Sequence, residues 1–321
     1  MKSSKASSTP LARGMTTAGL AFAATLLALA PALHAQPGGQ LQPGQSASSV
    51  DATFIQQFNT ELGSDGDVSL NSIGVRYNLL HSLGEGRTIG GSLGYTADYF
   101  DFSGSFYPKG YIPGPFNPWG SIHTLNLTGL YGCKMGEDWK FRIVPSLTLS
   151  GESSASVSDS LIYGGIFTFT REISDKLTLG IGGGGFSELE EIRGFPILAV
   201  RWEFAPGWTL QNPLRPGPAG PAGLEVSYKL DDWDFGMGAA YRSYRFRLED
   251  QGFNPNGIGE HTSAPLFLRA SRSITQSLNL DVYGGVLLGG SIKWEHSNGD
   301  ELIGWDFDPA PFLAISFTGR F

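Results

Sequence analysis

The chain contains 321 residues, of which 45 are glycine and only 16% are charged, and its formal net charge is −8. This acidic balance argues against a nucleic-acid partner, because nucleic-acid binding depends on clustered basic side chains. After residue 35 no stretch approaches the ~20 consecutive apolar residues of a membrane-spanning helix, and a single cysteine, Cys133, excludes an intramolecular disulfide framework. Few charges, many glycines and no long apolar run are typical of a transmembrane β-barrel, in which one face of each strand contacts lipid.

The N-terminal segment has the three parts of a secretory signal peptide. Three basic residues precede an apolar run rich in Ala and Leu, which ends at Ala35 before a polar stretch. Because the run is too short for an uncleaved anchor, the sequence predicts a signal peptide over residues 1–35. Residues 36–49, mostly Gln, Gly, Pro and Ser, are predicted to be a disordered periplasmic lead-in.

Beyond this lead-in the chain alternates apolar with small or polar residues, which is the period of a β-strand. The segment 138–150 shows two such sets: Trp139, Phe141, Ile143, Leu147 and Leu149 on one face, and Lys140, Arg142, Ser146 and Thr148 on the other. A soluble β-sandwich would give the same alternation. The connections favour a barrel, because short turns alternate with long links, as periplasmic turns and outer loops do. The predicted long links are 102–120, 151–158, 187–195, 212–222, 249–261 and 295–308.

The pattern predicts an all-β, antiparallel, up-and-down transmembrane barrel over residues 50–321, with about fourteen strands and twelve as the alternative. An even number is expected because both ends of the chain lie on the periplasmic side. The first strand alternates poorly, so its segment could instead lie inside the barrel. The predicted strands are 50–60, 68–80, 88–101, 121–133, 138–150, 159–171, 176–187, 196–204, 207–212, 222–230, 233–248, 263–273, 277–294 and 309–321.

The last predicted strand ends the chain on an aromatic residue. Leu313, Ile315, Phe317 and Phe321 share one face of it. This segment resembles the closing strand of bacterial outer-membrane β-barrel proteins. The resemblance implies that Phe317 and Phe321 belong to the signal read by the barrel-assembly machinery. It also implies the outer membrane of a Gram-negative bacterium as the location, with lipid and lipopolysaccharide as surroundings.

Segments 194–202, 208–213 and 224–228 carry a narrower resemblance. They are similar to an uncharacterised family of outer-membrane β-barrel proteins, a domain of unknown function, and the resemblance covers most of the mature chain. Its motifs are loose patterns of strand residues. Since the family has no assigned activity or catalytic residues, the resemblance implies the fold alone.

Histidines are the residues most relevant to enzymatic activity, because outer-membrane hydrolases need one beside a Ser or Asp at the outer rim. His81 adjoins a predicted periplasmic turn, whereas His123, His261 and His296 fall near the outer end. No Ser lies in a recognisable nucleophile motif, so we expect scattered histidines in solvated loops and no enzymatic activity. The acidic loops lack the spacing of a calcium site, and neither a metal nor another cofactor is predicted.

The predicted link 102–120 is dense in aromatic residues and proline between Phe106 and Trp119. It could fold inward as a constriction, or present aromatic rings to a sugar or an apolar solute. It could equally be a stiff outer loop whose aromatic side chains join the interfacial girdle. The sequence leaves both possibilities open.

Charged residues that alternate with the apolar face are expected to point into the lumen. About fourteen strands enclose more space than side chains alone fill, so we expect a porin-like channel for passive or facilitated diffusion of small solutes. Lumen charges of both signs would tune its selectivity. The alternatives are a non-conducting structural or surface-binding barrel and a hydrolase at the rim. The lumen candidates are Arg76, Asp98, Lys140, Arg142, Arg201, Glu203, Glu225, Lys229, Arg242, Arg269 and Asp281.

Overall fold

The computed structural model describes residues 41–321 except 105, 107–116, 214 and 221. The predicted signal peptide and residues 36–40 of the predicted lead-in therefore lie outside the described residues. Strand pairing begins at Ser46, earlier than the expected start at residue 50. None of the described residues forms a helix that is long and apolar enough to cross a membrane.

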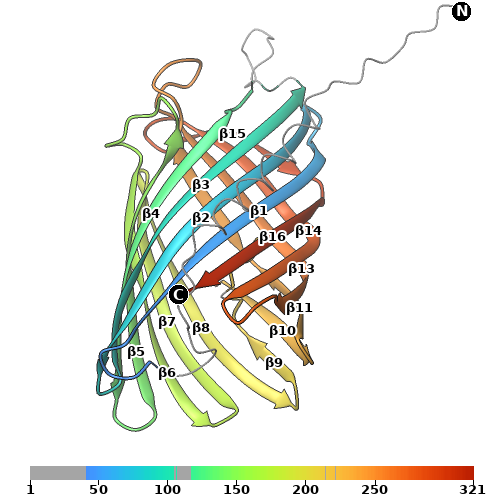
Figure 1. Cartoon of the computed structure of the whole chain (residues 1–321). Helices are drawn as coiled ribbons and strands as arrows, with labels where there is room; N and C mark the ends of the chain where they lie inside the picture. Colours follow the sequence, from blue (N-terminus) through green and yellow to red (C-terminus); the bar gives the residue numbers. More distant parts are fainter. Residues whose placement is uncertain (1–40, 105, 107–116, 214, 221) are drawn as a thin grey trace, which may run out of the picture.

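Strand segments follow one another along the described chain, joined by turns and loops (Figure 1). They are β1 (Ser46–Leu62), β2 (Gly66–Gly84), β3 (Arg87–Gly104), β4 (Ser121–Met135), β5 (Trp139–Glu152), β6 (Leu161–Ser174), β7 (Leu177–Glu188), β8 (Glu191–Ala205), β9 (Trp208–Gln211), β10 (Gly223–Leu230), β11 (Trp233–Ala240), β12 (Arg242–Arg247), β13 (Ile258–Ser273), β14 (Leu278–Glu295), β15 (Glu301–Phe307) and β16 (Ala310–Arg320).

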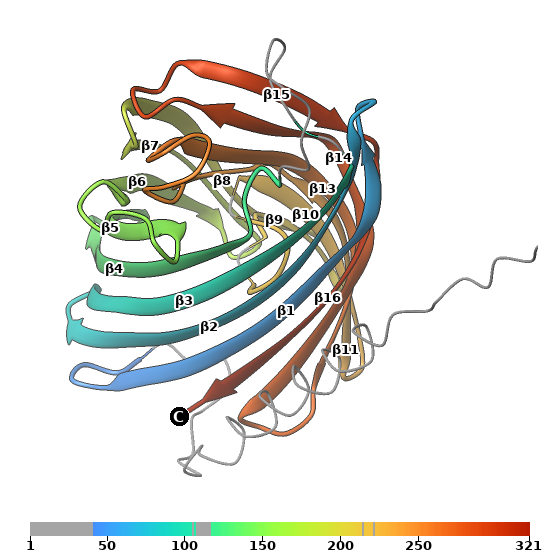
Figure 2. The same ribbon diagram turned by 90° about the horizontal axis from the view of Figure 1, so that it is seen from above.

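These segments form a closed antiparallel barrel of fourteen strands. The count is lower than the number of segments because β11 and β12 continue each other across Tyr241, as β15 and β16 do across Asp308 and Pro309. The ring closes where β16 pairs with β1, in a register that includes Val50↔Gly319 (Figure 2). The predicted architecture is confirmed, and β1 lies in the wall rather than inside the barrel.

The two faces of the wall have opposite chemistry. Charged side chains on the inner face include Arg269 and Asp281, which are almost completely buried. Large apolar side chains are exposed on the outer face instead, among them Leu93, Leu127, Ile143, Leu147, Phe167, Leu198 and Leu268. A water-soluble barrel would have the reverse arrangement, so the outer face is the one that contacts lipid.

Among the predicted long links, 187–195 and 295–308 contain strand structure instead. The link 187–195 is a tight turn at Leu189 and Glu190, because β7 and β8 pair as far as Glu188↔Glu191. Both turn residues have positive φ, 45° and 72°, as a two-residue hairpin turn of type I′ requires. The link 295–308 contains β15, which pairs with β14. Charged side chains made both segments look like solvated loops.

Phe321 completes the closing strand on the lipid side. Its N–H donates to the carbonyl of Ser48 at 2.9 Å, and burying its ring contributes at most about 1.5–3 kcal/mol. We therefore expect deletion of Phe321 to reduce insertion in cells much more than the stability of detergent-refolded protein. The measurements are the amount of protein in the outer-membrane fraction and the unfolding midpoint in urea. Normal membrane levels of the truncated chain would contradict the predicted assembly signal.

Candidate functional site

One side of the lumen is filled by an ion network on the inner face of β10, β11, β13 and β14. Arg269 donates from Nε and Nη2 to the two carboxylate oxygens of Glu225, at 3.1 and 2.7 Å. It also donates from Nη2 to Asp234 at 2.9 Å. Arg215 donates to Asp234 at 2.9 Å and to Asp281 at 3.1 Å. Two guanidinium groups thus pair with three carboxylates, and the side chain of Arg269 is 0% exposed.

Arg215 belongs to the β9–β10 link, residues 212–222, which was predicted to be an outer loop. Its described residues instead reach into the barrel. The hydroxyl of Tyr283 donates to the carbonyl of Pro216 at 3.1 Å, and Arg242 donates to the carbonyl of Pro218 at 3.1 Å. These hydrogen bonds, together with the ion pairs of Arg215, hold the link against the inner face of the wall.

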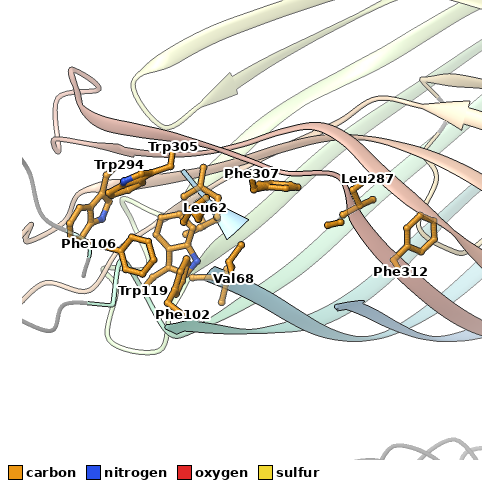
Figure 3. Close-up of a cluster of buried hydrophobic side chains, with 14 of the residues drawn as sticks. Leu62, Val68, Phe102, Phe106, Trp119, Leu287, Trp294, Trp305, Phe307 and Phe312 are labelled. Atoms are coloured by element: carbon orange, nitrogen blue, oxygen red, sulfur yellow. The ribbon is translucent and has the colours of Figure 1, made fainter. Parts of the chain in front are cut away.

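Aromatic side chains form a buried cluster inside the outer end of the barrel (Figure 3). The ring of Trp119 lies edge-on to Phe102 and Phe246, with centroids 5.5 and 4.9 Å apart. Phe106 lies edge-on to Trp305 at 5.6 Å. Phe106 and Trp119 are the described ends of the aromatic loop, and both are buried inside the barrel. The intervening residues 107–116, on which the two sequence interpretations differ most, lie outside the described residues.

β12 leaves the wall and crosses the mouth of the barrel. Its last residue, Arg247, pairs in parallel with Gly151 of β5, which is far from β12 in the order of strands around the ring. In Figure 2 the orange segment that follows β12 lies inside the ring. Gly289 of β14, with φ +53°, lies beside a register shift between β13 and β14. Such bulges bend strands, and here the bend accompanies the inward lean of β12–β14.

The remaining part of the lumen is a cavity of about 1460 Å³ with three kinds of wall. The inner face of β3–β5 contributes polar groups: the neutral Thr96, Thr124, Asn126, Ser146 and Thr148, and the carboxylate of Asp98. The inner face of β6–β8 is apolar: Ile162, Ile166, Phe186, Phe195 and Ile197. The leaning β12–β14 segment, with the adjoining ends of β7 and β8, adds charged groups: Glu188, Glu191, Arg193, Arg242, Arg245, Glu260 and Lys293. The chamber is thus amphipathic.

The charged groups bind β8 to β12–β14. Arg193 donates from both terminal nitrogens to Glu260, at 2.5 and 3.0 Å, and to the hydroxyl of Ser243 at 3.2 Å. Arg245 donates to Glu191 at 2.7 Å and forms an ion pair with Glu295. These contacts hold the crossing segment against the upper end of β8.

The predicted lumen residues all occupy the inward register, but they do not form one site. Glu225, Arg269 and Asp281 meet in the ion network, and Asp98 and Arg242 line the cavity. Lys140 pairs with Glu172 at 2.5 Å, and Glu203 with Lys176 at 3.8 Å. The other four candidates are exposed within the lumen: Arg76, Arg142, Arg201 and Lys229.

Sequence reasoning missed Arg193, Arg215, Asp234, Arg245 and Glu260. Arg193, Arg215 and Glu260 fell in predicted long links. Asp234 alternates with Trp233 and Phe235, so the strand pattern could have found it. Arg245 shares the outward register of Tyr241, which predicts a position facing lipid. It lines the cavity because β12 leaves the wall, and nothing in the local sequence indicates that.

The histidines considered for a hydrolase do not come together. His123 lies on the outer face, where its Nδ1 is 2.8 Å from the hydroxyl of Tyr95. His261 is buried among aromatic rings, and His296 is exposed in the β14–β15 turn. His81 contacts the hydroxyl of Ser46 at 2.9 Å at the periplasmic end, and no hydrogen bond of the described residues joins it to a carboxylate. Within the described ranges, no three His, Cys, Asp or Glu residues gather as metal ligands would.

A closed antiparallel barrel with an apolar outer face and a polar, partly open lumen defines the class: this is a transmembrane β-barrel of the bacterial outer-membrane type. The predicted resemblance to such proteins is confirmed at the level of the fold.

No family model and no curated protein matches the sequence. Among solved structures, the chain is similar to an outer-membrane channel from Pseudomonas putida F1, with 12% identity and a TM-score of 0.47 over 90% of this chain and 100% of that one. It is also similar to the P. putida toluene transporter TodX, with 8% identity and a TM-score of 0.41 over 88% and 91%. The NanC porin is 10% identical to the chain, with a TM-score of 0.36 over 84% of this chain and 98% of that one. At these values the similarity concerns the barrel fold.

Proposed function

We propose that this protein is an outer-membrane channel through which small solutes pass by diffusion. The observation that carries the proposal is the open cavity of about 1460 Å³ in the lumen, within a barrel whose other side is filled by paired charges and aromatic rings. A purely structural barrel has no need of such a space. No catalytic role is assigned to the dispersed histidines.

Four inward-facing cations suggest which solutes the channel favours. Arg76, Arg142, Arg201 and Lys229 are exposed in the lumen, and none of them forms an ion pair with another described residue. The nearby Lys140 and Lys176 are neutralised by Glu172 and Glu203. The inward-facing carboxylates of Asp51 and Asp98 also have no ion-pair partner among the described residues, but each residue is only 8% exposed. Exposed lumen cations raise the local concentration of anions, so the proposed channel prefers anions.

Single-channel recording in planar bilayers under a KCl gradient tests both the proposed conduction and the proposed anion preference. We expect discrete conductance steps and a reversal potential that indicates anion preference. Arg142→Glu should shift the reversal potential toward cation preference, because it replaces an unpaired lumen cation by an anion. Arg87→Glu is the matched control, since Arg87 lies at the β2–β3 turn beside Glu85. Well-folded protein without conductance steps would favour the non-conducting alternative, and cation preference of the unmodified protein would contradict the proposed selectivity.

The location of the protein follows the same proposal. An apolar outer face supports residence in a lipid bilayer, and the terminal Phe321 supports insertion by the barrel-assembly machinery. Residues 1–35 would direct export across the inner membrane and be removed. The outer loops would then face lipopolysaccharide at the cell surface.

A further inference from the structure

The barrel wall is interrupted between the upper part of β8 and β12. Ladder pairing of β8 with β9 covers only Arg201↔Gln211 to Ala205↔Trp208. Residues 191–197 of β8 pair with β7 alone. On the other side, β10 begins at Gly223, opposite Ala240. β12, beyond that point, pairs with β13 and touches β5. Among the described residues, no strand bridges the two edges.

The sequence of β8 is compatible with an open edge, because Pro196 faces the side that has no partner strand. The carbonyl of Leu198 and the N–H of Val200 both bond to the side chain of Asn212, at 2.9 Å each, so both point toward the open side. Successive strand residues point their backbone groups to alternate sides, and Pro196 therefore points there as well. Proline has no N–H to leave unpaired, which is why it is tolerated at strand edges.

The cavity extends through this interruption. Its lining combines inward-facing residues of β8, Phe195 and Ile197, with outward-facing ones on both sides of the gap: Ile192, Leu198, Leu224 and Tyr241. Ile192 is 85% exposed and Tyr241 58% exposed on the lipid side. Along the intact β3–β5 wall the cavity touches alternate residues only, whereas along β8 it touches every residue from Glu191 to Leu198. It therefore reaches the unpaired edge of β8, so the lumen opens sideways here.

The opening has polar boundaries above and below and apolar sides. Above it, Arg193 binds Glu260 and Arg245 binds Glu191. Below it, Asn212 donates to the carbonyl of Gly223 at 3.1 Å and so links β8 to β10. These contacts fix the height of the opening while leaving residues 192–198 without a partner strand on that side.

The depth of the opening corresponds to the outer leaflet. Trp202 faces outward beside the periplasmic β8–β9 turn, where aromatic girdles lie. With a rise of about 3.4 Å per residue and a tilt of about 40°, Leu198 lies roughly 10 Å and Ile192 roughly 26 Å above Trp202. The apolar band of such barrels is about 25 Å tall, so the opening faces acyl chains rather than water.

We infer that this opening is a lateral entrance by which small amphipathic anions pass between the outer leaflet and the lumen. The inference rests on the proposed channel function and specifies its substrate class. An apolar portion would lie against Phe186 and Phe195, whose rings are nearly parallel with centroids 6.1 Å apart. The anionic group would face Arg242 and the hydroxyl groups of β3–β5, and then the exposed cations of the periplasmic half. The aromatic cluster and β12 occupy part of the mouth.

A reversible cross-link across the opening tests this entrance. The variant Leu198→Cys/Leu224→Cys places one thiol on each side of it, with Cys133→Ser to remove the native thiol. A bifunctional methanethiosulfonate reagent joins the thiols, and a reductant releases them. The control is Leu125→Cys/Leu149→Cys, because these outward-facing residues are direct partners in the intact β4–β5 wall.

The probe is 1-naphthalenesulfonate, an aromatic anion, and the readout is its uptake into proteoliposomes. Cross-linking at 198/224 should reduce uptake to the rate of protein-free liposomes, and the reductant should restore it, while cross-linking of the control pair leaves uptake unchanged. Uptake that persists after complete cross-linking at 198/224 would overturn the lateral entrance and leave the channel function intact. If the protein gave no uptake before cross-linking and no conductance steps, the proposed function itself would fail.

Discussion

Arg269→Leu is expected to destabilise the barrel by about 3–5 kcal/mol, because removing one partner of a buried ion pair leaves uncompensated charge. The side chain of Arg269 is 0% exposed and that of Glu225 3%. The substitution would leave the Glu225 carboxylate without its cation, and would remove the weaker of two cations beside Asp281, at 3.7 Å. The measurement is the free energy of unfolding in urea for protein refolded into lipid.

Two comparisons decide whether the loss comes from the ion network. Arg142→Leu removes an exposed lumen cation and should cost less than about 1 kcal/mol. The double variant Arg269→Leu/Glu225→Leu should be more stable than Arg269→Leu, because it also removes a stranded carboxylate. An equal loss for Arg142→Leu, or no recovery in the double variant, would mean that the network contributes little to stability.

Ile143→Arg should be the second most damaging change, with a loss of about 2–4 kcal/mol for a basic residue at mid-bilayer depth on the lipid face. Ile143 is outward-facing and 40% exposed, and its cross-strand partners are Tyr131 and Phe167. Ser146→Arg on the same strand is the control, because it points into the cavity, where water and polar groups can solvate the guanidinium. Both are measured by unfolding in lipid, and equal losses would contradict the assignment of the two faces.

The strands of the barrel wall could be predicted because the environment of each residue, lipid or lumen, follows from its position along its own strand. A strand between lipid and a polar lumen must alternate at period 2, so the predicted strand 138–150 corresponds to Trp139–Glu152. The inward register of Arg269 and Asp281 follows from the same alternation. Strand patterns therefore revealed which charges face the lumen.

What the sequence did not reveal depends on distant partners. Glu188, Glu191 and Arg193 look like a solvated loop, yet Arg193 pairs with Glu260, 67 residues later in the chain. Arg215 lies in a Pro/Gly-rich link whose inward path is set by Asp234 and Asp281. The alternation of apolar and polar residues predicts which face of the wall a side chain lies on, but it does not predict where a strand leaves the wall. For that reason the opening beside β8 could not be predicted from the sequence.

Pro196 has a consequence for how neighbouring molecules behave. An exposed strand edge is a template on which another polypeptide can add a strand, and this is how β-proteins aggregate or exchange segments. An unfolded barrel chain has unpaired strands of its own, which could add to such an edge during assembly. A proline whose ring occupies a donor position interrupts any continuous ladder there. Pro196, which is compatible with an open edge of β8, thus also protects the barrel against strand addition by other chains.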